Sequence, residues 1–359
     1  MDANRKYFTT RLLEWNKKTN DRPMPWKGEQ DPYKIWLSEI ILQQTRVEQG
    51  WNYYNNFVAA FPTIDKLAKA PETTVFKLWE GLGYYTRCKN LIATARHIVK
   101  EFKGKFPDDY ELILTLKGIG PYTAAAIASF AYNLPYAVVD GNVFRVLSRY
   151  FADQTAIDST EGKRKFTHLA NELLDKKLPG IYNQALMDFG AVVCKPKLPL
   201  CAKCPLQKKC GAYAKGLVNV LPIKEKKIAQ KVRWLYYLII ESGDKVYVRK
   251  RGLKDIWENL YEFVLLEMPA VTDVEALKKT GDFKTMLGKN QFTVETISKL
   301  YSQKLTHQTI HGQFITLKLI KAATLAGYEL VSPKELATLP FPKFITSYLQ
   351  DKNVSLNLL

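Results

Sequence analysis

Residues 116–124 read Leu-Lys-Gly-Ile-Gly-Pro-Tyr-Thr-Ala, a tight turn between two apolar patterns of helical spacing. Gly118 and Gly120 permit positive φ and let the backbone approach a partner closely. Pro121 suits the first turn of the second helix. The free N–H groups at that helix start, strengthened by the helix dipole, favour a bound phosphate. A plain helix–helix turn is the alternative interpretation.

Outward from this turn, the first 210 or so residues predict helices separated by short turns rich in Gly, Pro and Asp. Asp31 and Pro32 are typical of a helix start, and the spacing after them predicts a helix over Tyr33–Val47. Similar patterns recur at Val58–Ala68, Thr74–Gly81, Lys89–Phe102, Glu111–Leu116, Thr123–Tyr132, Asn142–Tyr150, Lys163–Leu174 and Asn183–Val193.

The charge of the chain indicates a polyanionic partner. Its 359 residues carry 53 Lys and Arg against 35 Asp and Glu, a formal charge of +18. Eleven of the basic residues and one acid, Glu225, lie within residues 195–233, which suits either a solvated linker or a strap along a nucleic-acid backbone. No apolar run is long enough to span a membrane, and residues 1–20 lack a signal-peptide core, so we expect a cytoplasmic protein.

Four of the five cysteines are crowded into one short segment. Cys194, Cys201, Cys204 and Cys210 have the spacing C-x6-C-x2-C-x5-C. Four thiolates serve either zinc or an iron–sulfur cluster. Zinc sites usually use paired short knuckles, whereas only one short pair occurs here, so the pattern favours a cluster and leaves zinc open. We expect Cys88 to be a free thiol.

Two carboxylates stand out from apolar surroundings. Glu39 lies in an otherwise apolar helical run, where burial would raise its pKa and make it an acid usable near neutrality. Asp140 follows an apolar run and precedes a helix, so it could cap that helix and stay ionised. The alternatives are that Glu39 is exposed on the surface of its helix and that Asp140 serves only as a helix cap. One raised acid beside one ionised carboxylate is the pairing that cleaves glycosidic bonds.

Two further segments carry residues suited to an opened DNA duplex. Gln43, Gln44 and Thr45 supply polar groups that could fill or read the space vacated by a base. Tyr84 lies in a glycine-rich stretch and could wedge into a base stack, although a simple turn at residues 81–87 is the alternative.

After Gln230 the pattern becomes that of an α+β domain. Short runs rich in β-branched and aromatic residues predict strands at Trp234–Glu241, Lys245–Lys250, Tyr261–Glu267 and Gly312–Lys321. Helices are expected at Asp273–Lys279, at Lys284–Leu287 and near Ser332–Leu336.

Together the cysteine spacing, the 116–123 hairpin and Asp140 resemble the helix–hairpin–helix DNA glycosylases that carry a [4Fe–4S] cluster. Residues 36–45, Trp-Leu-Ser-Glu-Ile-Ile-Leu-Gln-Gln-Thr, resemble the signature of the A/G-specific adenine glycosylases within that superfamily. The resemblance covers roughly residues 5–215. It implies an all-helical glycosylase domain over 1–215 with a cluster on the four cysteines, a basic linker over 216–231, and a Nudix-like 8-oxoguanine recognition domain over 232–355.

The runner-up is the endonuclease III branch, whose members combine glycosylase and lyase activities. That branch has a lysine nucleophile where this chain has Tyr122, so no Schiff base can form by that route. The C-terminal extension points the same way, because the adenine enzymes carry a Nudix-like domain that recognises 8-oxoguanine. No catalytic Nudix box occurs in it, so we expect no pyrophosphate hydrolysis. At the position of the family's Phe-Ser-His loop it has Leu305, Thr306 and His307, which lack the aromatic residue, and an ordinary strand-end histidine is the alternative for His307.

The resemblance implies excision of adenine opposite 8-oxoguanine or guanine in double-stranded DNA, by a monomer. Glu39 would protonate the base and Asp140 would stabilise the sugar cation, with Tyr122 and Asn142 beside them. The residues expected to contact DNA are Gln43, Gln44, Thr45, Tyr84, Gly118, Gly120, Thr306 and His307. A non-catalytic DNA-binding module is the alternative, and it would not need both carboxylates in one pocket.

Overall fold

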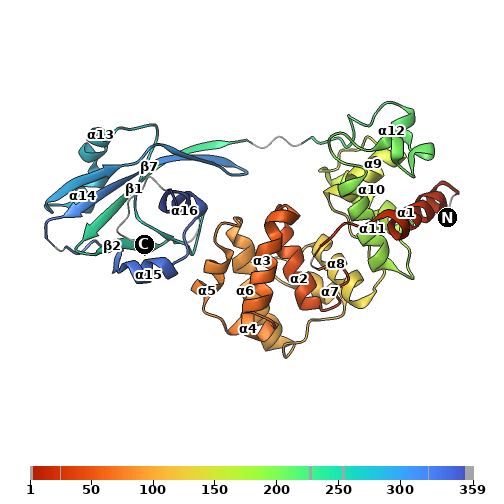
Figure 1. The fold of residues 1–359 in the computed structure, drawn as a ribbon, viewed down its shortest axis with the longest axis horizontal. Helices are drawn as coiled ribbons and strands as arrows, with labels where there is room; N and C mark the ends of the chain where they lie inside the picture. The colour runs from red at the N-terminus through yellow and green to blue at the C-terminus, as the bar shows by residue number, and fades with distance from the viewer. Residues whose placement is uncertain (1–2, 25, 226–228, 253–254, 322, 352–359) are drawn as a thin grey trace. The chain divides into compact units, whose positions relative to one another are not determined.

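The computed structural model describes residues 3–24, 26–225, 229–252, 255–321 and 323–351, and the chain divides into two compact units (Figure 1). The first unit comprises Met1–Lys69 and Asn90–Lys227, and the second comprises Ala70–Lys89 and Ile228–Leu359. Residues 226–228 of the expected linker and 352–355 of the expected second domain lie outside the described residues, so these boundaries stay predictions.

The first unit is helical, as expected. A turn separates each helix from the next, and α6 begins in the second unit and continues into the first. Its elements are α1 (Ala3–Thr19), α2 (Pro32–Leu42), α3 (Val47–Ala60), α4 (Ile64–Lys69), α6 (Tyr85–Glu101), α7 (Tyr110–Thr115), α8 (Pro121–Tyr132), α9 (Gly141–Phe151), α10 (Thr160–Leu173), α11 (Pro179–Val192), the short 3₁₀ turns Cys201–Lys203 and Gln207–Lys209, and α12 (Gly211–Ala214).

The helix predicted over Tyr33–Val47 is wrong at its end. Helix α2 stops at Leu42, the backbone turns through residues 43–46, and α3 begins at Val47. Gln44 takes a left-handed φ of 57° there, and the Gln43 amide donates to Thr123 Oγ1 at 3.3 Å. A contact distant in sequence therefore ends the helix where no Gly or Pro marks the break. The helix expected over Val58–Ala68 is likewise interrupted between Ala60 and Ile64.

The second unit is built on a mixed sheet. Its central strands β1 (Lys231–Ser242) and β7 (Gln308–Leu319) run parallel over eleven paired residues, and every other strand pair is antiparallel. The other strands are β2 (Lys245–Lys250), β3 (Tyr261–Glu262), β4 (Val264–Met268), β5 (Phe292–Ile297), β6 (Tyr301–Lys304) and β8 (Glu329–Val331). The strands β5, β6 and β8 were not anticipated from the sequence.

Helices pack on both faces of this sheet. On one face, alternate residues of β1 such as Tyr236 and Leu238 share a core with α13 (Val274–Lys279) and α14 (Gly281–Leu287). On the other face, Phe314 of β7 stacks on Tyr348 of α16 (Lys343–Leu349) at 4.0 Å between ring centroids. The remaining helices of the unit are α5 (Glu72–Trp79) and α15 (Pro333–Thr338).

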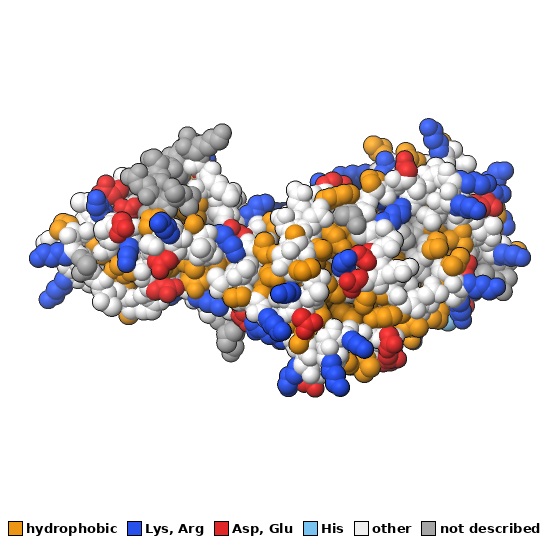
Figure 2. Space-filling view, turned by 60° about the horizontal axis from the view of Figure 1, so that its bottom comes forward, with side chains coloured by type: hydrophobic (Ala, Val, Ile, Leu, Met, Phe, Trp, Pro, Cys, Tyr) orange, Lys and Arg blue, Asp and Glu red, His pale blue; other side chains and the backbone are white. Residues whose placement is uncertain are grey.

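Lys and Arg side chains are distributed over the face drawn in Figure 2 rather than gathered into one patch. Among the described residues, no helix is both long and apolar enough to cross a membrane.

Candidate active site

The first carboxylate of the expected pair, Glu39, is buried in α2 and is only 5% exposed. Asp31 caps this helix by accepting from Tyr33 N at 2.9 Å, and Pro32 occupies its first turn. Burial raises the pKa of Glu39 to about 7; a hydrogen bond from Tyr122 opposes the shift, and the charge of Asp140 adds to it. Glu39 is therefore an acid that is half protonated near neutrality.

The second carboxylate, Asp140, caps α9 and is partly buried. Its Oδ1 accepts from Val143 N at 2.7 Å, and its Oδ2 accepts from Asn142 Nδ2 at 2.6 Å. Burial raises the pKa of Asp140, while these hydrogen bonds oppose the shift. Donors directed at a carboxylate favour its charged form, so the contacts that make Asp140 a helix cap also limit the rise of its pKa.

One cavity joins the residues expected to carry the chemistry. Glu39 from α2, Tyr122 from α8, and Asp140 and Asn142 from α9 all line a cavity of about 730 Å³. Burial, and then the charges of Glu39 and Asp140, raise the pKa of Tyr122 well above its usual value, so its phenol keeps its proton and can donate. A carboxyl group with a raised pKa, Glu39, and a carboxylate that caps a helix, Asp140, thus line the same cavity.

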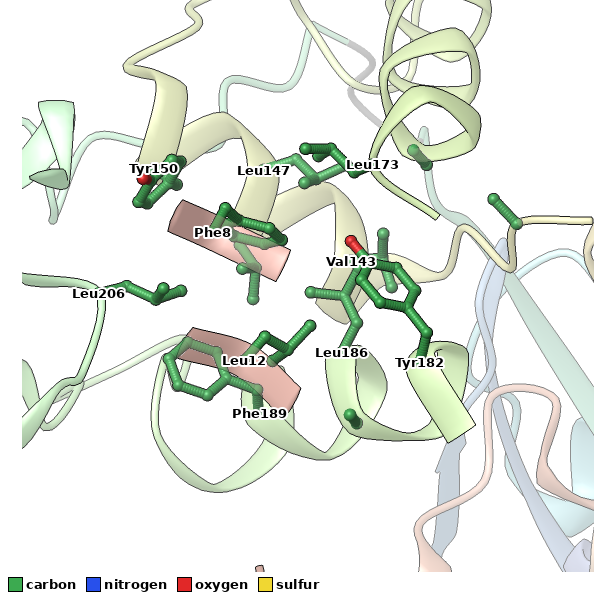
Figure 3. Close-up of a cluster of buried hydrophobic side chains, with 14 of the residues drawn as sticks. Phe8, Leu12, Val143, Leu147, Tyr150, Leu173, Tyr182, Leu186, Phe189 and Leu206 are labelled. Carbon is green, nitrogen blue, oxygen red and sulfur yellow. The ribbon is translucent and has the colours of Figure 1, made fainter. Parts of the chain in front are cut away.

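A shared hydrophobic core holds α9 against α1 and α11 (Figure 3). Val143 and Leu147 of α9 pack with Phe8 and Leu12 of α1, and with Leu186 and Phe189 of α11. Leu206, from the cysteine-rich segment, packs against the same core. The helix that begins at Asp140 is therefore positioned by the same contacts that position the cysteine loop.

Two buried arginines of α9 were missed in the sequence. Arg145 donates from Nη2 to Asn142 Oδ1 at 2.8 Å, and from Nε to the carbonyl of Cys194 at 2.8 Å. Arg149 donates to the carbonyls of Lys195 at 2.7 Å and Leu221 at 3.0 Å. The available signal was two arginines four residues apart among the apolar residues of one helix.

The four cysteines line one small pocket together with Arg149. Arg149 Nη1 lies 3.5 Å from Cys194 Sγ. Among the described residues, no group of His, Cys, Asp or Glu side chains is placed to hold a single metal ion. Four thiolates that share one pocket are the donor set of either a zinc ion or an iron–sulfur cluster, so the residues present fit the expected cluster.

The hairpin has the geometry expected for an anion site. Gly118 takes a φ of 81°, and a Cβ there would lie 2.7 Å from that of Asn90. Gly120 caps α8 without a side chain, and nothing lies within 4 Å of where its Cβ would be. Both glycines are exposed. The α8 start is thus open to solvent, as a phosphate would require.

The remaining candidates fall into two groups. In the first unit, Thr45 lines the cavity and Gln44 is exposed in the turn after α2. In the second unit, the Tyr84 hydroxyl and Thr306 Oγ1 are hydrogen-bonded at 2.8 Å, and His307 is exposed beside them in the chain. Tyr84 is 44% exposed with a left-handed φ of 50°, an unusual backbone for a bulky residue.

Comparison with known proteins places both units. Residues 37–173 match the model of the HhH-GPD superfamily of base excision DNA repair proteins, and residues 235–351 match that of the NUDIX domain. An adenine DNA glycosylase of Buchnera aphidicola subsp. Schizaphis graminum is 34% identical over 306 residues, covering 85% of each chain. The human adenine DNA glycosylase is 41% identical over 214 residues, covering 57% of this chain and 39% of that protein.

Solved structures agree for the helical part. A thermostable thymine-DNA glycosylase has a TM-score of 0.55 and 31% identity, covering 59% of this chain and 97% of its own. An endonuclease III–DNA complex has a TM-score of 0.50 at 18% identity, covering 60% of this chain and 99% of its own, which supports the fold alone.

Proposed function

This chain belongs to the adenine DNA glycosylase family, and from that premise we propose that it excises adenine paired with 8-oxoguanine or guanine, leaving an abasic site. The observation that carries the proposal is the common cavity of Glu39 and Asp140. A non-catalytic DNA-binding module would not need a half-protonated acid and a capped carboxylate facing one space.

The reaction needs the base outside the stack. Adenine in a duplex is unreachable, so the nucleotide is flipped into the cavity. Glu39 gives its proton to N7, and the N9–C1′ bond then breaks with its electron pair passing to the base. The sugar becomes an oxocarbenium ion, which Asp140 stabilises by charge or by a transient covalent bond. Water adds at C1′, displacing Asp140 where that bond has formed, and gives its proton to the Glu39 carboxylate, which restores the acid; Tyr122 and Asn142 position the nucleophile.

The absence of an amine at position 122 supports a monofunctional enzyme. Tyr122 occupies the first turn of α8 and faces the cavity. A phenol whose pKa is raised cannot form a Schiff base with the sugar, so the strand is not cut by that route.

Recognition of the opposite base is assigned to the second unit. Tyr84 would enter the base stack, and Thr306 and His307 would contact 8-oxoguanine. The bond between Tyr84 and Thr306 supports this division because it joins the wedge to the recognition loop. Gln43, Gln44 and Thr45 would fill the space left by the flipped base, and Gly118 and Gly120 would bind phosphate.

We propose that Cys194, Cys201, Cys204 and Cys210 hold a [4Fe–4S] cluster. The bound cluster would cross-link the lysine-rich loop, and no step of base removal passes through it. Purified protein should be brown and contain about four irons per chain. A colourless protein with one zinc and full activity would refute this assignment.

Glu39→Gln tests the proposed function. The amide keeps the shape and hydrogen bonding but has no proton to give, so single-turnover adenine release at saturating enzyme should fall by about 10²–10⁴-fold or more. Binding to an A:8-oxoguanine duplex should be nearly unchanged. Glu14→Gln, which alters an exposed ion-paired glutamate on α1, is the matched control. Release at the parental rate by Glu39→Gln would sink the mechanism.

A further inference from the structure

A further buried carboxylate, that of Asp188, lies beside the cavity and has no part in the mechanism above. Asp188, on α11, is completely inaccessible to solvent. Its Oδ1 accepts from Arg22 Nη1 at 2.8 Å and from Gln184 Nε2 at 3.0 Å. Its Oδ2 accepts from Asn20 Nδ2 at 2.9 Å and lies 3.4 Å from Lys27 Nζ. A buried carboxylate that accepts from this many donors is held in one position.

The partners of Asp188 form part of the cavity wall. Arg22, Lys27 and Gln184 line the same cavity as Glu39 and Asp140, while Asp188 itself lies behind them. Arg22 and Lys27 are fixed from one side by a single carboxylate, and their side chains are 22% and 33% exposed. Asp188 therefore sets the orientation of polar groups that a flipped base would meet.

The effect of Asp188 on Gln184 is directional. An ionised carboxylate only accepts hydrogen bonds, so it must be met by the amide nitrogen of Gln184 and never by the amide oxygen. The two residues are four apart on α11, the spacing at which side chains on a helix meet. Among the described residues, no group donates to Gln184 Oε1. The oxygen is thus left as an acceptor at the cavity wall.

We propose that Asp188 is a positioning residue that fixes the amide of Gln184 so that the cavity presents a hydrogen-bond acceptor, and thereby favours a 6-aminopurine over other purines. The inference rests on the proposed function. Adenine offers donors from its exocyclic amine, whereas a 6-oxopurine offers an acceptor at that position. A fixed acceptor pairs with the first and leaves two facing acceptors with the second.

The test is the ratio of single-turnover release rates from three duplexes that carry adenine, purine without the exocyclic amine, or hypoxanthine opposite the same base. In Asp188→Asn the neighbour can donate as well as accept, so the Gln184 amide can turn either way. The adenine-to-purine ratio should fall by about fivefold, the loss of one neutral hydrogen bond. The adenine-to-hypoxanthine ratio should fall as well.

The double variant Gln184→Glu/Asp188→Asn separates positioning from general damage. The carboxylate introduced at position 184 presents acceptors from both oxygens whichever way it turns, so the parental adenine-to-purine ratio should return. Because each ratio is internal to one preparation, a reduced folded fraction lowers both rates equally and cancels. Asp153→Asn, which disrupts an ion pair with Lys165 away from the cavity, should leave the ratio unchanged.

Two results would overturn the inference, and they are distinguishable. Adenine release by the unchanged enzyme together with an unaltered ratio in Asp188→Asn would refute the role of Asp188 alone. No adenine release by the unchanged enzyme would refute the proposed function and this inference with it.

Discussion

Helices α8 and α9 begin in different ways, although we expect the first turns of both to act on DNA. Helix α8 is capped by Gly120, which has no side chain, and its exposed N-terminus is open. Helix α9 is capped by Asp140, whose carboxylate accepts from Val143 N at 2.7 Å. The free N–H groups and dipole of a helix start attract an anion. The first turn of α8, which has no side-chain cap, can bind a phosphate group of a partner. The first turn of α9 already holds the carboxylate of Asp140 and orients that charge toward a ligand.

Removing the charge of the residue that caps α9 should have the largest effect on adenine release. Asp140→Asn keeps a good capping side chain but removes the charge, so the fold should persist while the sugar cation loses its stabilisation. We expect single-turnover adenine release to fall by about 10³-fold. Asp273→Asn, which changes the equivalent cap of α13, is the control. Parental activity in Asp140→Asn would reduce Asp140 to a structural cap.

A carboxylate inside a helix should titrate differently from one at its start. Glu39 has no helix-start N–H to bind, and its pKa is raised to about 7 by burial. Because the proposed mechanism uses the protonated form of Glu39, adenine release should fall about tenfold per pH unit above pH 7. Ionisation of Asp140 should limit the rate only on the acid side. A rate independent of pH between 6 and 9 would contradict this assignment.

The same raised pKa has a consequence for stability. The folded state binds the proton of Glu39 more tightly than the unfolded state does, so the unfolding free energy should decrease as pH rises from 4.5 to about 7. The decrease attributable to this group is at most about 3 kcal/mol. Urea unfolding of the parent and Glu39→Gln at several pH values measures it, since the amide does not titrate.

Closing the open start of α8 should have the smallest effect. Gly120→Asp gives α8 the cap that α9 has, and the space around the new Cβ is empty. The added anion should displace one phosphate, weakening duplex binding about tenfold and reducing the slope of log K against log salt by about 1. Gly281→Asp, at the first residue of α14, is the control. An unchanged slope would remove α8 from the DNA contact.

Local sequence patterns predicted those helices and strands that depend mainly on neighbouring residues. The helices from α6 to α11 were expected within a few residues because apolar periodicity and Gly, Pro or Asp at their ends agree. The turn after Leu42 was missed because its residues contain no breaker, and the contact between Gln43 and Thr123 spans 80 residues. The short strand β8 depends in the same way on pairing with β2, which lies far away in the sequence, whereas β5 and β6 pair with β7, the long strand that follows them.

The residues of the candidate site also differ in whether a local sequence signal marks them. Glu39 could be singled out because it interrupts an apolar run, Asp140 because it follows one and precedes a helix, and the cysteines because of their spacing. Asp188 and Arg22 could not, because they lie 166 residues apart in the chain and neither carries a local signature. Buried charge networks arise from tertiary packing, so their members resemble ordinary surface residues until the fold brings them together.

Arg149 donates to three main-chain carbonyls, those of Lys195, Pro196 and Leu221, and to one side chain, the Sγ atom of Cys194. Every residue type offers the same carbonyl at these positions. Substitutions between the cysteines should therefore leave these contacts in place, whereas replacement of Arg149 would remove the donors that make them. Substitutions in the loop would then change the side chains that it presents at its surface, while its backbone stays held by the same contacts with Arg149.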